Sequence, residues 1–155
     1  MRYYLDEVKL EDKDILYRLL EYSLYEESET DGNEPNERGE FVYRHFDSYF
    51  TDDNRYAFLI KEEETNKLLG FVMINNYIRH IDNGHSIAEY LILPKYRRNK
   101  IGKRVAYEVL DMFPGFWEIK PSLGNERTYL FWENVVNSYT DGDYEFIEDS
   151  FVFKN

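Results

Sequence analysis

A short basic segment between a strand-like run and a helix-like run constrains this chain more than any other feature. Residues 95–104 read Lys-Tyr-Arg-Arg-Asn-Lys-Ile-Gly-Lys-Arg, with six basic residues and no acidic one, in a chain of formal net charge −12. The first backbone N–H groups of a helix have no intrahelical partner, and the helix dipole favours negative charge there. A strand, a basic turn and a helix start therefore predict a site for a specific polyanionic ligand. The plain alternative is a solvated basic turn.

The apolar periodicity along the rest of the chain predicts an α+β fold in one domain, residues 1–155. Strands are expected at residues 3–8, 55–61, 68–77, 87–93, 116–120, 144–147 and 151–153. About four helices are expected: one starting near Asp12 or Asp14 with its apolar face running to Leu24, and others at residues 40–50, 101–113 and 127–139. Residues 26–40, with seven acids and one base, are expected to form a mobile loop.

Composition excludes several classes of function. The chain has no cysteine, so disulfides, thiolate metal sites and a cysteine nucleophile are absent. Its three histidines are scattered, and no metal site is expected. The acidic balance argues against nucleic-acid binding, and no apolar run reaches the ~18 residues of a membrane span. Without a signal-peptide pattern at the start, a cytoplasmic protein is expected, as a monomer or homodimer.

The basic turn resembles the signature of the GNAT superfamily of N-acetyltransferases: Arg or Gln, two residues, Gly, one residue, then Gly or Ala. Arg97 and Gly102 fill the outer positions, and Lys100 replaces the middle glycine. The preceding Leu-Pro-x-Tyr-Arg run and Asn125, followed seven residues later by an aromatic position, are also typical of the superfamily. Residues 24–29 and 39–41 resemble a bacterial group of predicted acetyltransferases.

This resemblance implies a GNAT-like fold, with a mostly antiparallel, splayed sheet and acetyl-CoA between the fourth and fifth strands. Backbone N–H groups of the basic turn would bind the pyrophosphate, and the pantetheine arm would pair with the preceding strand. The implied cofactor-binding residues are Tyr90, Leu91, Ile92, Arg97, Arg98, Asn99, Lys100, Ile101, Gly102, Lys103, Arg104, Asn125 and Trp132.

Acetyl transfer to an amine requires a group that removes a proton from the ammonium, and Glu89 is the candidate catalytic residue. It lies on the implied cofactor strand, where members of the superfamily often carry an acid. The alternatives are an exposed Glu or one paired with the basic turn. Relatives protonate the leaving thiolate with a Tyr that Trp132 replaces here, and Tyr139 is a possible substitute or a core residue. Asn125 lies beside the cofactor, caps a helix, or does both.

The acceptor is expected to contact Tyr25, Glu26, Glu27 and Glu29 at the end of the first helix, unless these form a solvated acidic surface. Because acids crowd there and bases crowd at the cofactor turn, a small cationic amine without a carboxylate is the preferred substrate. The sequence thus favours an acetyl-CoA-dependent N-acetyltransferase. A non-catalytic acyl-CoA sensor and a protein N-acetyltransferase are the alternatives.

Overall fold

The computed structural model describes residues 1–155 and contains seven strands, three α-helices and three short 3₁₀ turns. The strands are β1 (Tyr3–Glu7), β2 (Tyr56–Glu62), β3 (Leu68–Asn75), β4 (Ser86–Ile92), β5 (Phe116–Ile119), β6 (Glu145–Ile147) and β7 (Ser150–Lys154). The helices are α1 (Lys13–Asp31), α2 (Ile101–Met112) and α3 (Glu126–Thr140), and the 3₁₀ turns are η1 (Leu10–Asp12), η2 (Phe46–Phe50) and η3 (Pro94–Tyr96). All seven predicted strands are present, with small differences at their ends.

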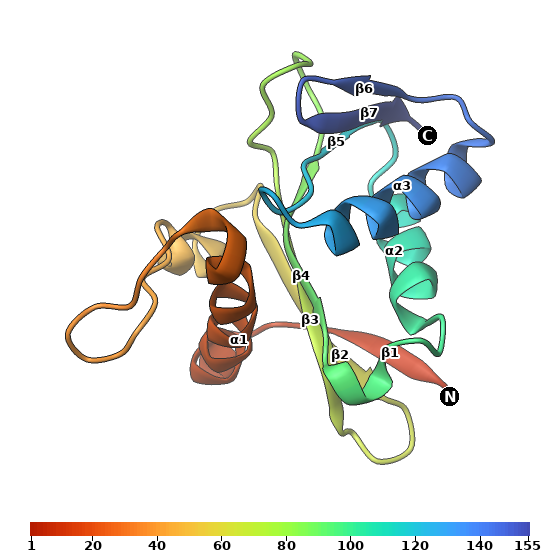
Figure 1. Ribbon diagram of the computed structural model, residues 1–155. Coiled ribbons are helices and arrows are strands. Elements are labelled where there is room, and N and C mark those ends of the chain that lie inside the picture. The colour runs from red at the N-terminus through yellow and green to blue at the C-terminus, as the bar shows by residue number, and fades with distance from the viewer.

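Two antiparallel sheets meet at one end and separate at the other. Strands β1 to β4 form one sheet in sequence order, and β5, β7 and β6 form the second. The sheets join where His85, just before β4, forms a parallel bridge with Trp117 of β5. Beyond that bridge the two strands diverge (Figure 1) and one edge of β4 has no partner strand. The expectation of a splayed sheet is therefore confirmed.

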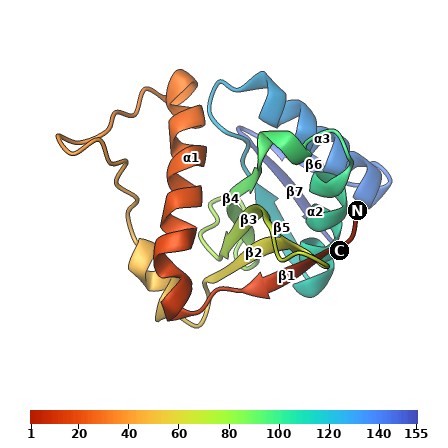
Figure 2. The ribbon, with the colours of Figure 1, turned by 90° about the horizontal axis from the view of Figure 1, so that it is seen from below.

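The two faces of the larger sheet bury separate hydrophobic clusters. Helix α1 covers one face, where Leu16 and Leu20 pack with Leu59 and Phe71. Helices α2 and α3 and the second sheet cover the other face (Figures 1 and 2), and their cluster includes the fully buried Trp117. Both helical layers therefore hold β4 from opposite sides, with its free edge between them.

The predicted helix at residues 40–50 is wrong, so the fold has three α-helices where about four were expected. Only the 3₁₀ turn η2 forms there, because His45 adopts a left-handed conformation with φ 66° that interrupts a helix before Phe46. The predicted acidic loop starts too early, since α1 continues through Asp31 and ends at Gly32, whose φ of 78° suits a left-handed C-cap. None of the helices combines the length and apolar character that crossing a membrane requires.

Candidate functional site

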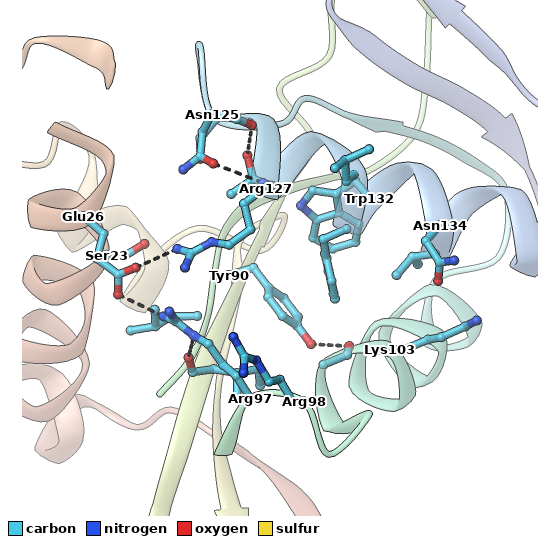
Figure 3. A pocket seen from close by; sticks show the side chains of 18 of the residues that line it. Ser23, Glu26, Tyr90, Arg97, Arg98, Lys103, Asn125, Arg127, Trp132 and Asn134 are labelled. Atoms are coloured by element: carbon cyan, nitrogen blue, oxygen red, sulfur yellow. Dashed lines mark hydrogen bonds and ion pairs between the residues drawn. The ribbon is translucent and has the colours of Figure 1, made fainter. Parts of the chain in front are cut away.

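A cavity of about 650 Å³ opens beside the C-terminal end of β4, between α1 and helices α2 and α3. Its walls come from the C-terminal half of α1, the end of β4, the basic turn, the start of α2 and the start of α3 (Figure 3). We call it the cofactor cavity. The sequence placed its candidate cofactor residues on these same elements.

The start of α2 offers a row of free backbone donors to this cavity. Arg104 is the first residue of this segment whose backbone N–H donates within the helix, to Lys100 O at 3.1 Å. The N–H groups of Ile101, Gly102 and Lys103 have no acceptor in the protein. Such a row, at the positive end of a helix dipole, suits a phosphate group.

Lys100 adopts the backbone conformation that glycine would have allowed more easily. It is the N-cap of α2, with φ 62° and ψ 9°, and Arg98 also lies in the left-handed region at φ 72°. Lysine reaches this region at a cost of roughly 1–2 kcal/mol. Lys100 therefore holds a left-handed backbone position that glycine would occupy at lower cost.

Gly102 lets α2 approach the aromatic wall of the cavity. A Cβ at this position would lie 3.2 Å from Phe131 Cε1 on α3, tighter than an ordinary contact. The wall consists of Tyr90, Phe131 and Trp132, with the Tyr90 and Trp132 rings 5.4 Å apart. The Tyr90 hydroxyl donates to Gly102 O at 2.5 Å, and burial raises its pKa. Tyr90 is therefore part of the packing and remains a neutral phenol.

Glu26 joins two arginines across the mouth of the cofactor cavity (Figure 3). Arg97 donates to Glu26 Oε1 at 2.9 Å and, through Nε, to Ile92 O at 2.7 Å. Arg127 donates to the other oxygen of Glu26 at 3.1 Å. This carboxylate thus faces the cofactor side and neutralises part of the basic turn.

Three predicted cofactor residues do not present side chains to this cavity. Ile101 is buried in the core, Arg104 donates to Met1 O at 3.2 Å and stacks over Tyr3, and Asn99 is absent from the lining. These side chains point elsewhere because a turn that directs its backbone inward cannot direct every side chain inward as well. The predicted residues that do line the cavity are Tyr90, Leu91, Ile92, Arg97, Arg98, Lys100, Gly102, Lys103, Asn125 and Trp132.

Asn125 and Tyr139 have clear structural roles. Asn125 caps α3 by accepting the Thr128 N–H at 3.2 Å, and it also lines the cofactor cavity, so its contact with the cofactor stays a prediction. Tyr139 donates to Asp111 at 2.6 Å and packs on Tyr107, outside the cavity. Tyr139 is therefore not a substitute for the tyrosine that Trp132 replaces.

A second cavity of about 360 Å³ adjoins the first. Glu27 and Ser122 line both cavities, and Glu89 lines the second. We call this the acceptor cavity. A β-bulge in β4 contributes to its shape: Met73 pairs with Glu89 but Ile74 pairs with Ile87, which leaves Ala88 as an extra residue.

Glu27 and Glu89 form a carboxyl pair where the cavities meet. Their side chains lie within hydrogen-bonding reach, and Glu89 Oε1 is buried without a donor when both groups are ionised. Burial and the neighbouring Glu27 raise the pKa of Glu89 well above its usual range. Burial also raises the pKa of Glu27, but hydrogen bonds from Glu89, Ser23 and Ser122 oppose that rise. Glu89 is therefore the carboxyl of the pair that takes up a proton more readily.

The four predicted acceptor residues lie on different faces of α1. Glu27 lies between the cavities and Glu26 faces the cofactor cavity, whereas Tyr25 is 71% exposed and, like Glu29, lines neither cavity. A helix turns about 100° per residue, so four residues this close in sequence cannot share one face. The predicted contact of Tyr25 and Glu29 with the acceptor is therefore not supported by their positions.

Sequence reasoning missed several residues of the acceptor cavity. Tyr43, Arg79, Lys120 and Ser122 come from loops and a strand end outside any motif. Burial and the nearby Glu89 raise the pKa of Tyr43, so its phenol stays protonated. No periodic or motif signal marks these positions, because only the tertiary fold brings them together. No cluster of three or more metal-ligating side chains is present.

Comparisons with known proteins agree with this architecture. The Acetyltransferase (GNAT) family model matches residues 21–134. An acetyltransferase from Thermus thermophilus is 16% identical, with a TM-score of 0.68 and coverage of 100% of this chain and 98% of that one. A predicted acetyltransferase from Clostridium acetobutylicum, solved with acetyl-CoA, is 13% identical, with a TM-score of 0.61 and coverage of 84% and 88%.

A third similar structure is an aminoglycoside antibiotic 6′-N-acetyltransferase from Acinetobacter baumannii. It is 11% identical, with a TM-score of 0.60 and coverage of 86% of this chain and 89% of that one. No curated protein matches the chain in sequence at a significant level. These structural similarities show the shared α+β fold, and the family model covers well over half of the chain. The chain therefore belongs to the GNAT acetyltransferase family.

Proposed function

We propose that this protein transfers the acetyl group of acetyl-CoA to a primary amine on a small molecule. The observation that carries the proposal is the meeting of a phosphate-compatible cavity and an acid-containing cavity at Glu27 and Ser122. Two substrates in these cavities would present their reacting groups to each other at this junction. Holding two reactants in contact is itself a large part of catalysis.

The cofactor cavity fits acetyl-CoA in three respects. The free N–H groups of Ile101, Gly102 and Lys103 suit the pyrophosphate. The unpaired edge of β4 suits the amide groups of the pantetheine arm, which would add to it as a further strand. The aromatic wall suits the apolar parts of the arm. Bound acetyl-CoA would supply the acetyl thioester.

The carboxyl pair provides the base that the amine requires. A free alkyl ammonium has a pKa of about 10.4, so almost none is neutral near pH 7. A carboxylate of the Glu27–Glu89 pair would attract the ammonium and accept one of its N–H protons. The freed nitrogen lone pair then forms a C–N bond with the acetyl carbon as the C–S bond breaks. The second N–H proton passes to the departing sulfur.

The size of the acceptor cavity favours a small molecule over a protein side chain. Its volume of about 360 Å³ lies at the lower end of the range for small-molecule sites. Protein acetylation is therefore the less favoured of the two catalytic alternatives. The identity of the amine depends on which groups surround the carboxyl pair.

The test is acetyl-CoA-dependent thiol release across a panel of small amines, with the N-acetylated products identified by mass spectrometry. We expect turnover with at least one amine class. Acetyl-CoA binding without turnover of any amine or of a lysine peptide would instead identify a non-catalytic acyl-CoA-binding protein. Turnover of the peptide alone would favour protein acetylation.

A further inference from the structure

The acceptor cavity is lined by charged side chains of both signs. Glu27 and Asp31 of α1 lie close to Glu89. Arg79 and Lys120, from the segments after β3 and after β5, line the same cavity. A purely cationic substrate would be attracted by the first group and repelled by the second.

Arg79 is held in place by a buried acid. Glu118 on β5 is only 4% exposed, and its two carboxylate oxygens accept the backbone N–H groups of Arg79 at 2.9 Å and His80 at 2.7 Å. Because both of its oxygens are already bonded, Glu118 is poorly placed to bind an ammonium group. Its role is to fix the loop that carries Arg79, which is the kind of preorganisation that a binding group needs.

Asp149 orients the two cations without using up their donors. Both oxygens of Asp149 accept from a single terminal nitrogen of Arg79 at 2.7 Å, and Lys120 Nζ lies 3.6 Å away. The remaining guanidinium nitrogens of Arg79 make no hydrogen bond. The Arg79 and Lys120 side chains stay 56% and 51% exposed. Asp149 itself does not line the cavity.

We propose that the acceptor is zwitterionic: Arg79 and Lys120 bind a carboxylate or similar anionic group while the Glu27–Glu89 pair binds the reacting amine. This deepens the proposed function and rests on it. Ser86 and Glu89 of β4 both line the acceptor cavity together with Arg79 and Lys120, so one cavity offers both kinds of charged group to a bound molecule. An ω-amino acid of several carbons, or a short peptide with a free amine, carries an amine and a carboxylate on separate ends of one chain and so could meet both groups. The acceptor expected from sequence, a cation without a carboxylate, is revised accordingly.

The experiment compares ω-amino acids of four to six carbons with n-alkylamines of the same length, which lack only the carboxylate. We expect wild type to prefer the amino acids in kcat/KM, and Arg79→Met and Lys120→Met each to reduce that preference about tenfold, mainly through KM. The matched control Lys67→Met, in the remote β2–β3 turn, should leave the preference unchanged. Asp149→Asn should increase the preference for amino acids, because the substitution releases both cations to bind the carboxylate.

A binding measurement keeps the test independent of turnover. Titration calorimetry of the amino acid against wild type in the presence of CoA should show binding that Arg79→Met and Lys120→Met weaken. Equal use of alkylamines and amino acids, with no response to either substitution, would overturn the zwitterionic acceptor and leave the acetyltransferase proposal standing. The absence of turnover with any amine would instead contradict the proposed function. In that case the calorimetry alone would test the zwitterionic site, through the effect of Arg79→Met and Lys120→Met on binding.

Discussion

The two cavities that meet at Glu27 and Ser122 are built in different ways. The cofactor cavity depends on one contiguous segment, residues 97–104, whose backbone donors and basic side chains face a free strand edge. The acceptor cavity depends on single side chains from α1, β3, β4, β5, β7 and three connecting segments. A site made by backbone groups tolerates sequence change, as Lys100 shows, whereas a site made by dispersed side chains can change its ligand with one substitution.

The largest effect is expected from removing the ionisable group at the junction. Glu89→Gln should lower kcat/KM for the amine by about 10²–10⁴-fold, because it removes the carboxyl with the higher pKa, which is the stronger base of the pair. Thermal shift by acetyl-CoA should persist, since the cofactor cavity is intact. The loss should shrink as pH approaches the amine pKa of about 10.4, where less proton removal is needed. A matched change, Glu64→Gln in the β2–β3 turn, should have no effect; an unchanged rate in Glu89→Gln at neutral pH would remove Glu89 from the mechanism.

The same substitution should change how stability depends on pH. The pKa of Glu89 is raised on folding, so the folded state keeps a proton that the unfolded state loses first. Wild-type stability should therefore fall as pH rises from the unfolded pKa through the folded one. The glutamine side chain in Glu89→Gln cannot ionise, so the melting temperature of this variant should rise relative to that of wild type over that pH range. A constant difference across pH would show that Glu89 ionises normally in the folded protein.

The next effect concerns the cofactor cavity. Acetyl-CoA at 100 times its Kd should raise the melting temperature of wild type by about 5–10 °C, which corresponds to roughly 2.7 kcal/mol. Gly102→Glu should abolish this shift, because it places a carboxylate against the phosphate site and crowds Phe131. Gly102→Ala serves as the control, since its Cβ requires only a small adjustment of the ring. A folded Gly102→Glu protein with the full shift would show that the basic turn is not the phosphate site.

The charge of Glu26 should affect binding in the cofactor cavity and not in the acceptor cavity. Glu26→Gln frees Arg97 and Arg127 from an acid at the mouth of the cofactor cavity. We expect KM for acetyl-CoA to fall by up to about fivefold, in line with the ~1 kcal/mol of an exposed ion pair. KM for the amine should stay the same. A change confined to the amine KM would place Glu26 on the acceptor side, as the sequence suggested.

The smallest effect tests the backbone at Lys100. Lys100→Gly should stabilise the fold by about 0.5–1 kcal/mol, because glycine adopts the left-handed conformation without a Cβ penalty. For a chain of this size that raises the melting temperature by about 2–4 °C. Lys100→Ala retains the Cβ and should give no gain. Equal stability of the two variants would mean that the turn is not strained at Lys100.

Local sequence patterns predicted most of the fold and the part of the site that one contiguous segment forms, the basic turn. Alternating and helical spacing identified the seven strands and the three α-helices, and the basic turn identified the cofactor cavity. The helix expected at residues 40–50 failed because the left-handed backbone at His45 has no reliable sequence signal. The partnership of Glu27 with Glu89, and the placement of Arg79 and Lys120 in one cavity, depend on contacts distant in sequence.

The most direct test of the account is a carbon-13 NMR titration of the glutamate side-chain carboxyls, assigned with Glu27→Gln and Glu89→Gln. We expect the Glu89 signal to titrate well above the ordinary glutamate pKa of about 4.3, with a smaller rise for Glu27. A substrate amine should lower the pKa of the pair because its positive charge favours ionisation, whereas CoA should have little effect. Ordinary titration of both carboxyls, or a pair indifferent to the amine, would contradict the assignment of Glu27 and Glu89 as the meeting point of cofactor and acceptor.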